Sequence, residues 1–237
     1  MTESISSLRI KGKLRPENVL YVGCTHIPFE HKHYLEFCKE IQSRCKCDQV
    51  VHLGDLVDNH SISYHEHDPN GWAPLTEMEE TDKHLEKWFK AFPNLYLCRG
   101  NHDLLVDRKG KTVGLPRRCF QKFRDIWNLP KGWIDGFEFT IHGVRSIHGT
   151  KRSGKLAHVN LAIESMSSAV MAHLHSNLGV NYLSQSGGET FGMAIGCGVD
   201  QEKYAFAYGV DSRYKNVVGC GVTTDNGKNA QVFPMRL

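Results

Sequence analysis

The sequence predicts an α/β fold in which two mixed β-sheets pack face to face and helices flank them. Strand-like and helical patterns alternate up to about residue 98, which is typical of parallel strands joined by crossover helices. From about residue 137 onward, short strand-like runs between Gly, Ser and Asn turns dominate. A chain of 237 residues can form one substantial core, so we expect a single domain over 1–237 with a loose lead-in at 1–17.

The first half is expected to alternate between strands and helices. Short apolar runs predict the strands, and apolar residues at helical spacing predict the helices. Thr76 and Glu79 form a capping-box pattern before the second helix, and the histidine-rich segment 59–71 lacks any period and is expected to be a loop. The expected elements are strand 18–23, helix 31–45, strand 49–53, helix 77–92 and strand 95–98.

The second half is expected to begin with a charged loop and then to become rich in strands. The charged residues 107–111 favour a loop, and Pro116 precedes a predicted helix. A glycine turn at Gly143 separates two strand-like runs that form a hairpin. The expected elements are helix 117–127, strands 137–142 and 144–148, helix 156–167, and strands 168–172, 179–184, 190–197, 203–208, 216–223 and 230–234.

The composition is that of a globular protein with an excess of histidine. Hydrophobic residues make up 40% and charged residues 23% of the chain, and a net charge of +3 is too small to indicate nucleic-acid binding by itself. Histidine occurs 14 times, and it is the commonest transition-metal ligand in proteins. The histidine content therefore raises the expectation of a metal site.

The sequence indicates a cytoplasmic protein. No run approaches the ~20 apolar residues of a membrane span, and the polar amino terminus lacks the apolar core of a signal peptide. The eight cysteines are therefore expected to be free thiols. Cys45 and Cys47 could form half of a zinc site, but no matching Cys/His pair lies nearby, which favours two incidental thiols.

Polar residues that can bind metals follow the predicted strands at five places. Each piece alone is a weak signal, because a Gly-Asp pair is usually a turn and an isolated histidine usually has a structural role. Parallel strands present functional side chains at their carboxyl ends, so we expect convergence on one crevice with Asp55 at its centre. The pieces are Cys24-x-His26, Gly54-Asp55-x-x-Asp58, Gly100-Asn101-His102-Asp103, His148-Gly149 and His173-x-His175. His142 also precedes a glycine, but its position at the Gly143 turn favours His148.

These motifs, in this order, resemble the signature of the calcineurin-like metallophosphoesterase superfamily. The resemblance spans about residues 19–176, and it implies a four-layer αββα sandwich and metal-dependent hydrolysis of phosphoesters. A wider pattern resembles metallophosphoesterases encoded by tailed bacteriophages, which would place the protein in the host cytoplasm. That pattern comprises residues 57–66, Gly114-Leu115-Pro116 and Tyr204-Ala205-Phe206-Ala207-Tyr208.

The resemblance implies a centre of two divalent metal ions that share Asp55. The first metal would take Cys24, His26, Asp55 and His175, and the second would take Asp55, Asn101, His148 and His173. A hydroxide that bridges the metals would attack phosphorus, while His102, oriented by Asp58, would assist the leaving group. The expected metals are Mn²⁺ or Zn²⁺/Fe.

Cys24 departs from the resembled pattern, which has aspartate at this position. A thiolate is a soft ligand and would bias the first site toward zinc or iron. Alternatively, Cys24 does not bind metal and the first site is weak or empty, or Cys24 is simply a buried structural thiol. The residues leave these three interpretations open.

Two histidines and three cations are candidates for substrate binding. His60 and His65 would line the substrate pocket, although with His67 they could instead form a further metal site or belong to a solvated loop. Arg108, Lys151 and Arg152 are cations in predicted loops that could hold a second phosphate or a nucleic-acid backbone, the alternative being a solvated basic surface. We find no interleaving of aromatic and basic residues typical of base stacking.

The favoured function is hydrolysis of a phosphoester in a phosphorylated small molecule or nucleic acid, with a slight preference for phosphodiesters. The alternatives are a phosphomonoesterase that acts on a phosphoprotein or nucleotide, and a scaffold that has lost catalysis and binds a partner. Cys24 is the feature that favours the scaffold. The motif residues from Asp55 to His175 argue against it, because a scaffold would not need all of them.

Overall fold

The computed structural model of the chain describes residues 9–10, 17–64, 71–203 and 215–236. Among these residues, no helix is long and apolar enough to cross a membrane. The helices are α1 (Tyr34–Arg44), α2 (Pro74–Ala91), α3 (Leu105–Thr112), α4 (Phe123–Ile126) and α5 (Ala157–Ser165), with 3₁₀ turns η1 (His60–Ile62) and η2 (Arg117–Cys119). The strands are β1 (Arg9–Ile10), β2 (Val19–Val22), β3 (Gln49–His52), β4 (Leu95–Cys98), β5 (Trp133–Gly136), β6 (Glu138–Ile141), β7 (Val144–Ile147), β8 (Ala169–Met171), β9 (Leu178–Gln185), β10 (Gly188–Ile195), β11 (Gly219–Thr224) and β12 (Asn229–Pro234).

The first sheet has the order β12-β11-β2-β3-β4-β5 and is mixed. Strands β2, β3, β4 and β5 are parallel to one another, whereas β11 is antiparallel to both β2 and β12. The register pairs Val22 with His52 and His52 with Leu97, so β2, β3 and β4 end at the same edge. The loops that follow these three strands therefore start side by side.

The second sheet has the order β1-β6-β7-β8-β10-β9 and is also mixed. Strands β7, β8 and β10 are parallel, while the β6–β7 and β9–β10 pairs are antiparallel hairpins. Ile147 on β7 pairs with Met171 on β8. His148 directly follows Ile147, and His173 comes two residues after Met171. The two histidine motifs of the second half therefore leave adjacent strands at the same edge.

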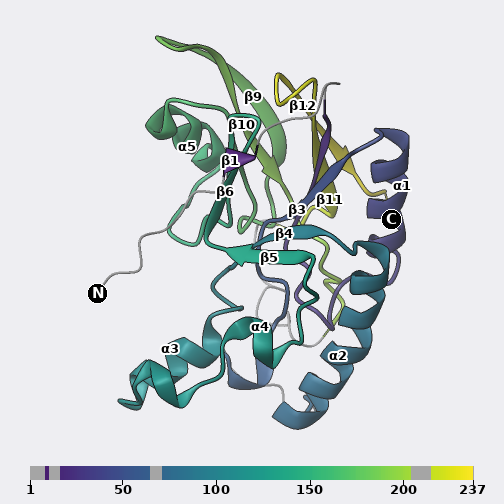
Figure 1. Cartoon of the computed structure of the whole chain (residues 1–237), viewed down its shortest axis with the longest axis vertical. Helices are drawn as coiled ribbons and strands as arrows, with labels where there is room; N and C mark the ends of the chain where they lie inside the picture. Colours follow the sequence, from purple (N-terminus) through teal and green to yellow (C-terminus); the bar gives the residue numbers. More distant parts are fainter. Residues whose placement is uncertain (1–8, 11–16, 65–70, 204–214, 237) are drawn as a thin grey trace.

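The helices and sheets form layers in the order helix, sheet, sheet, helix (Figure 1). Three apolar clusters pack these layers against one another. Tyr34 of α1 and Trp88 of α2 are buried against one face of the first sheet, whose alternate residues Val19 and Tyr21 face the second sheet. Leu161 of α5 packs on the outer face of the second sheet. The structure thus confirms the predicted fold of two mixed sheets with flanking helices.

Most predicted elements are present, and most differences concern the segments around the third helix. Residues 107–111, expected to be a loop, lie in α3, in which the residues Leu105 and Gly110 are buried. The predicted helix 117–127 is instead η2 followed by α4, separated by extended backbone at Phe120 and Lys122. Strand β5 was not predicted, nor was β1, which lies within the expected loose lead-in 1–17 and pairs with β6. The predicted strand 203–208 lies, except for its first residue, outside the described residues.

The predicted capping box of the second helix is wrong. Helix α2 begins at Pro74, its N-cap residue is Ala73, and no side chain caps it. Glu77 in its first turn is buried and instead accepts hydrogen bonds from the backbone N–H groups of His60 (2.7 Å) and Ser61 (2.8 Å). The carboxylate of Glu77 therefore holds η1, which follows Asp58, against α2.

Candidate metal centre

The seven predicted metal-binding residues follow five strands that end at one edge of the two sheets. Cys24 and His26 follow β2, Asp55 follows β3 and Asn101 follows β4. His148 follows β7, and His173 and His175 follow β8. The distances below show that the structure brings all seven together.

The imidazole of His148 lies at the middle of one half of this cluster. Its Nδ1 is 2.7 Å from the carbonyl oxygen of Leu53, which can only accept, so Nδ1 carries the proton. In the neutral ring Nε2 is then a lone-pair atom. It lies 3.1 Å from Oδ2 of Asp55, Oδ1 of Asn101 and Nδ1 of His173.

This arrangement fits a cation. Carboxylate oxygen, amide oxygen and neutral imidazole nitrogen are all metal ligands, and here they face one another at close range. Without a cation, His148 must be protonated to face Asp55: burial lowers the pKa of His148, but the carboxylate of Asp55 outweighs burial and raises it. The set Asp55, Asn101, His148 and His173 can therefore hold one divalent ion.

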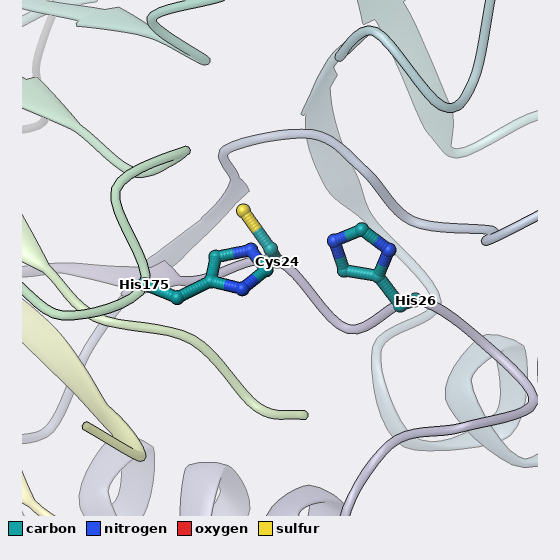
Figure 2. Close-up of side chains that lie close together, drawn as sticks. All are labelled: Cys24, His26 and His175. Atoms are coloured by element: carbon teal, nitrogen blue, oxygen red, sulfur yellow. The ribbon is translucent and has the colours of Figure 1, made fainter. Parts of the chain in front are cut away.

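Cys24, His26 and His175 form the other half of the cluster (Figure 2). One ligand atom from each lies within 4.8 Å of the others, and the ring centroids of His26 and His175 are 5.0 Å apart. Nδ1 of His26 lies 2.6 Å from Oδ1 of Asp58, so a neutral His26 ring presents Nε2 to the cluster. That nitrogen is 3.7 Å from Oδ2 of Asp55.

Asp55 contacts both halves. Its Oδ2 faces His148 at 3.1 Å and His26 at 3.7 Å, while its Oδ1 accepts the backbone N–H of His102 at 2.8 Å. Burial raises the pKa of Asp55, but the facing His148 and other histidines outweigh burial and hold the pKa well below its usual value. Asp55 is therefore a carboxylate in a position that two cations could share.

The structure places the sulfur of Cys24 inside the cluster. Its Sγ accepts the backbone N–H of His173 at 3.3 Å, and it is grouped both with His26 and His175 and with Asp55 and His148. Burial and the negative charge of Asp55 raise the pKa of the Cys24 thiol well above its ordinary value. A bound cation would lower the pKa of the Cys24 thiol, because metals bind and stabilise thiolates.

His102 and Asp58 lie beside His26. Nδ1 of His102 is 2.7 Å from the backbone oxygen of Asp58 and 3.2 Å from its Oδ1, and the rings of His102 and His26 are 4.5 Å apart. Burial lowers the pKa of His102, but hydrogen bonding to Asp58 and the charge of Asp55 raise it to about 10. Asp58 thus contacts both His102 and His26, and its shortest side-chain contact is the one to His26.

The backbone at the centre is unusual. Three of the seven predicted ligands, His26, Asp55 and His173, have positive φ angles of 49°, 47° and 64°. Such angles are uncommon outside glycine, although His, Asp and Asn adopt them more readily than other residues. Their clustering at one place is the kind of local strain that functional sites retain.

Asp103 holds the loops of the centre together, a role the sequence did not reveal. Its Oδ1 accepts the N–H groups of Leu56 (2.9 Å) and Val57 (3.2 Å), and its Oδ2 accepts that of Gly100 (2.7 Å). The carboxylate thereby joins the loop after β3 to the loop after β4. The signal in the sequence is the position of Asp103 directly after Gly100-Asn101-His102.

The predicted substrate-binding residues have different surroundings. His60 is buried, and its Nδ1 lies 3.9 Å from Oδ2 of Asp58. Arg108 is exposed on α3 and donates to the backbone oxygen of Asn101 at 3.4 Å. Lys151 is exposed, whereas Arg152 forms two hydrogen bonds to Glu164 of α5, at 2.7 and 2.6 Å.

Two further predictions concern histidines outside this set. His65, like His67, lies outside the described residues. His142 lies in the β6–β7 turn with Nε2 3.2 Å from Oε2 of Glu17. The structure therefore brings His148, and not His142, to the cluster. All eight cysteines fall within the described residues and are free thiols, as predicted.

The chain thus forms a layered α/β sandwich in which residues that can bind metal gather at the carboxyl ends of the strands. The model of the family described as calcineurin-like phosphoesterase matches residues 18–211, most of the chain. The protein belongs to this family, and the family implies divalent metal ions. No curated protein sequence matches the chain.

Several solved structures are similar to this one at low sequence identity. Vacuolar protein sorting 29 from Cryptosporidium parvum is 11% identical, with 94% of this chain and 99% of that chain covered and a TM-score of 0.48. A metallophosphoesterase from Sphaerobacter thermophilus is 14% identical, with 94% and 89% covered and a TM-score of 0.44. A phosphoesterase from E. coli is 16% identical, with 86% and 87% covered and a TM-score of 0.39.

Proposed function

We propose that the protein is a metal-dependent phosphoester hydrolase that holds two divalent ions through a shared Asp55. The observation that carries this proposal is the convergence of lone-pair atoms around Nε2 of His148, with Asp55 facing both this group and His26. A cation, or a proton held between His148 and Asp55, makes the close approach of Nε2 of His148 to the Asp55 carboxylate favourable. Membership of the calcineurin-like phosphoesterase family supports a bound cation.

The residues divide into two ligand sets. Cys24, His26, Asp55 and His175 would hold the first ion, and Asp55, Asn101, His148 and His173 would hold the second. When bound, the two ions would supply a hydroxide nucleophile at neutral pH and offset the negative charge of the phosphoryl group. The soft sulfur of Cys24 favours zinc or iron in the first set, and the oxygen ligands of the second set also accept manganese.

His102 would donate a proton to the leaving oxygen. Its Nδ1 is held by the backbone oxygen and carboxylate of Asp58, which directs Nε2 away from Asp58. The same contacts favour the protonated ring, as the raised pKa of about 10 indicates. A protonated imidazole held in this way is suited to general-acid catalysis.

We favour phosphodiesters over phosphomonoesters as substrates, since Arg108 of α3 donates to the backbone oxygen of Asn101 and could contact a group beyond the scissile phosphate. Arg152 gives less support, because Glu164 already pairs with it. A phosphatase that acts on a nucleotide or phosphoprotein is the alternative within the same chemistry. In either case the substrate is a phosphorylated small molecule or nucleic acid.

A scaffold that has lost catalysis is a second candidate, and Cys24 is the observation that favours it. Metal stoichiometry separates the two functions. Two ions per chain, measured by elemental analysis of the purified protein, support the enzyme, whereas no bound metal supports the scaffold.

The activity test is hydrolysis of bis-(p-nitrophenyl) phosphate by protein reconstituted with manganese, comparing the native chain with Cys24→Asp. Turnover by the native chain would establish a working enzyme with a cysteine at this position. Turnover by the aspartate variant alone would show that the remaining residues are intact and that Cys24 reduces activity. Absence of turnover in both proteins would contradict the proposal for this class of ester.

A further inference from the structure

A cavity lies beside the metal centre, and none of the predicted metal ligands lines it. Its volume is about 590 Å³, within the range of roughly 300–1,000 Å³ that is usual for ligand pockets. Residues of α3, the η2–α4 segment, β5 and Arg99 line it. Figure 1 shows α3 and α4 together at the end of the molecule that is far from α5.

The cavity carries an excess of positive charge. Its cationic residues are Arg99, Arg117, Arg118, Lys122 and Arg124, and its acidic residues are Asp107 and Asp135. Asp107 lies 3.2 Å from Arg117, and Asp135 lies 3.6 Å from Arg99 and 3.7 Å from Arg124. The exposed side chains of Arg118 and Lys122 make no hydrogen bond or ion pair with any residue that the structure describes. These two cations are available to an anionic ligand.

Aromatic rings accompany the cations. Phe137 in the β5–β6 turn is 44% exposed, and the guanidinium of Arg99 lies over its ring at 4.4 Å. Phe120 and Phe123 also line the cavity, within a segment that reads Arg117-Arg118-Cys119-Phe120-Gln121-Lys122-Phe123-Arg124. This segment does interleave basic and aromatic residues, contrary to our expectation from the sequence. Cations with an exposed ring are the combination that binds single-stranded nucleic acids.

A short loop connects the cavity to the metal centre. Arg99 and Leu104 line the cavity, and between them lie Asn101 and His102, which belong to the metal centre. Successive Cα atoms are ~3.8 Å apart, so the Cα atoms of Arg99 and Asn101 are separated by at most about 8 Å. One polymer could therefore occupy the metal centre and the cavity at once.

We propose that this cavity binds a nucleotide of a single-stranded nucleic acid whose scissile phosphodiester lies at the metal centre. Arg118 and Lys122 contact the phosphate backbone, and the exposed ring of Phe137 stacks on a base. The assignment rests on the proposed function and narrows it to nucleic-acid phosphodiesters. An acidic peptide would satisfy the cations but would leave the ring of Phe137 without a stacking partner.

The test is binding of a fluorescent octathymidylate with phosphorothioate linkages, which resists hydrolysis, to the full chain with its metals. The double variant Arg118→Glu/Lys122→Glu should weaken binding at least tenfold. The slope of log affinity against log salt should fall by about 1.4, because each lost phosphate contact contributes ~0.7 for single strands. The matched control is Lys46→Glu/Lys87→Glu, which changes the net charge equally at exposed lysines outside the cavity and should alter affinity less than twofold.

A second variant tests stacking. Phe137→Ala should weaken binding of octathymidylate about tenfold, the usual scale for loss of one stacked base, and should leave binding of an abasic octamer unchanged. Equal losses in the cavity variant and the charge-matched control would overturn the proposal. It would also be overturned if Phe137→Ala affected both oligomers alike, or if octaglutamate displaced octathymidylate at equal concentration.

The result can be separated from that of the proposed function. Hydrolysis of bis-(p-nitrophenyl) phosphate by the native chain tests the metal centre and does not require the cavity. Native activity without cavity-dependent binding contradicts only the nucleotide site. Cavity-dependent binding without native activity supports the nucleotide site and contradicts the hydrolase.

Discussion

Asp55 differs from the other residues of the centre because its carboxylate faces both ligand sets. Apart from Cys24, whose sulfur is also grouped with Asp55 and His148, the remaining ligands belong to one half, so a change in one of them should weaken one metal. Asp55 is also held by its neighbours, since its Oδ1 accepts the N–H of His102. A substitution of Asp55 should therefore affect both metal ions.

Asp55→Asn should abolish hydrolysis and reduce occupancy of both metals, because an amide removes the negative charge shared by two cations. Elemental analysis after reconstitution measures the occupancy directly. Asp82→Asn, at an exposed position on α2, is the control and should retain two ions per chain. Two ions in the Asp55→Asn protein would rule out the shared ligand.

His102→Ala should leave both metals bound and slow turnover by roughly 10²–10⁴, the usual contribution of general acid–base catalysis. The methyl group of alanine cannot donate a proton, whereas the backbone N–H that holds Asp55 remains. The measurements are kcat for bis-(p-nitrophenyl) phosphate and metal content, with exposed His33→Ala as control. A variant with the native rate would remove His102 from the mechanism.

Cys24 should bind the first metal as a thiolate, because its sulfur lies within the cluster of His26 and His175. Cobalt-substituted protein should then show the intense near-ultraviolet absorption of a thiolate-to-cobalt transition. Cys24→Ser should lose this absorption, while Cys98→Ser, a buried cysteine outside the cluster, should keep it. Absence of the band in the native chain at full cobalt loading would show that Cys24 does not bind metal.

At the scale of elements, the centre depends on how tightly the loops after β3 and β4 pack. Asp103 joins the two loops through three backbone N–H groups, and Gly100 lies directly against Asp55. A Cβ atom at Gly100 would come within 2.5 Å of the backbone nitrogen of Asp55. Neither loop can move without displacing the shared ligand.

Gly100→Ala should therefore impair metal binding although it adds only one methyl group to a residue that touches no metal. We expect loss of both ions and of activity, with a melting transition that remains cooperative because the apolar clusters are unchanged. Gly179→Ala on β9, where a Cβ would have open space, should behave like the native chain. Normal metal content in Gly100→Ala would show that the loops can separate.

The sequence predicted the strands that carry the centre because these strands are continuous apolar runs that end in distinctive polar motifs. It failed where tertiary packing decides the structure. Residues 107–111 are charged and read as a loop, yet Leu105 and Gly110 bury one side of α3. The β5 strand Trp133–Gly136 contains only one buried residue, so its sequence lacks the alternation of a strand and resembles a turn. Its pairing with β4 is what makes it a strand.

The candidate site shows the same limit at finer scale. The motif order identified the residues that the structure brings together, including His148 in preference to His142. Contacts that depend on three dimensions were not visible, such as the shorter contact of Asp58 with His26 or the three hydrogen bonds of Asp103. The cavity beside α3 could not be predicted for the same reason, because its lining comes from separate segments between Arg99 and Phe137.

At the scale of the whole molecule, the centre joins the two sheets. Its proposed ligands follow β2, β3 and β4 of one sheet and β7 and β8 of the other, above the apolar cluster that the sheets share. Without metal, this edge carries the carboxylate of Asp55 and several inward-facing imidazoles. Bound cations would therefore hold the two sheets together and stabilise the folded state.

Removal of the metals with a chelator should lower the melting temperature. An ion present at 100 times its Kd stabilises the fold by ~2.7 kcal/mol, which corresponds to a shift of roughly 5–10 °C for a chain of this size. Manganese or zinc should restore the native value in proportion to occupancy. The control is Asp55→Asn, whose melting temperature should respond little to either treatment. If the native chain melted at the same temperature with and without metal, while metal analysis confirmed two bound ions, the centre would lie on loops that fold independently of the two sheets.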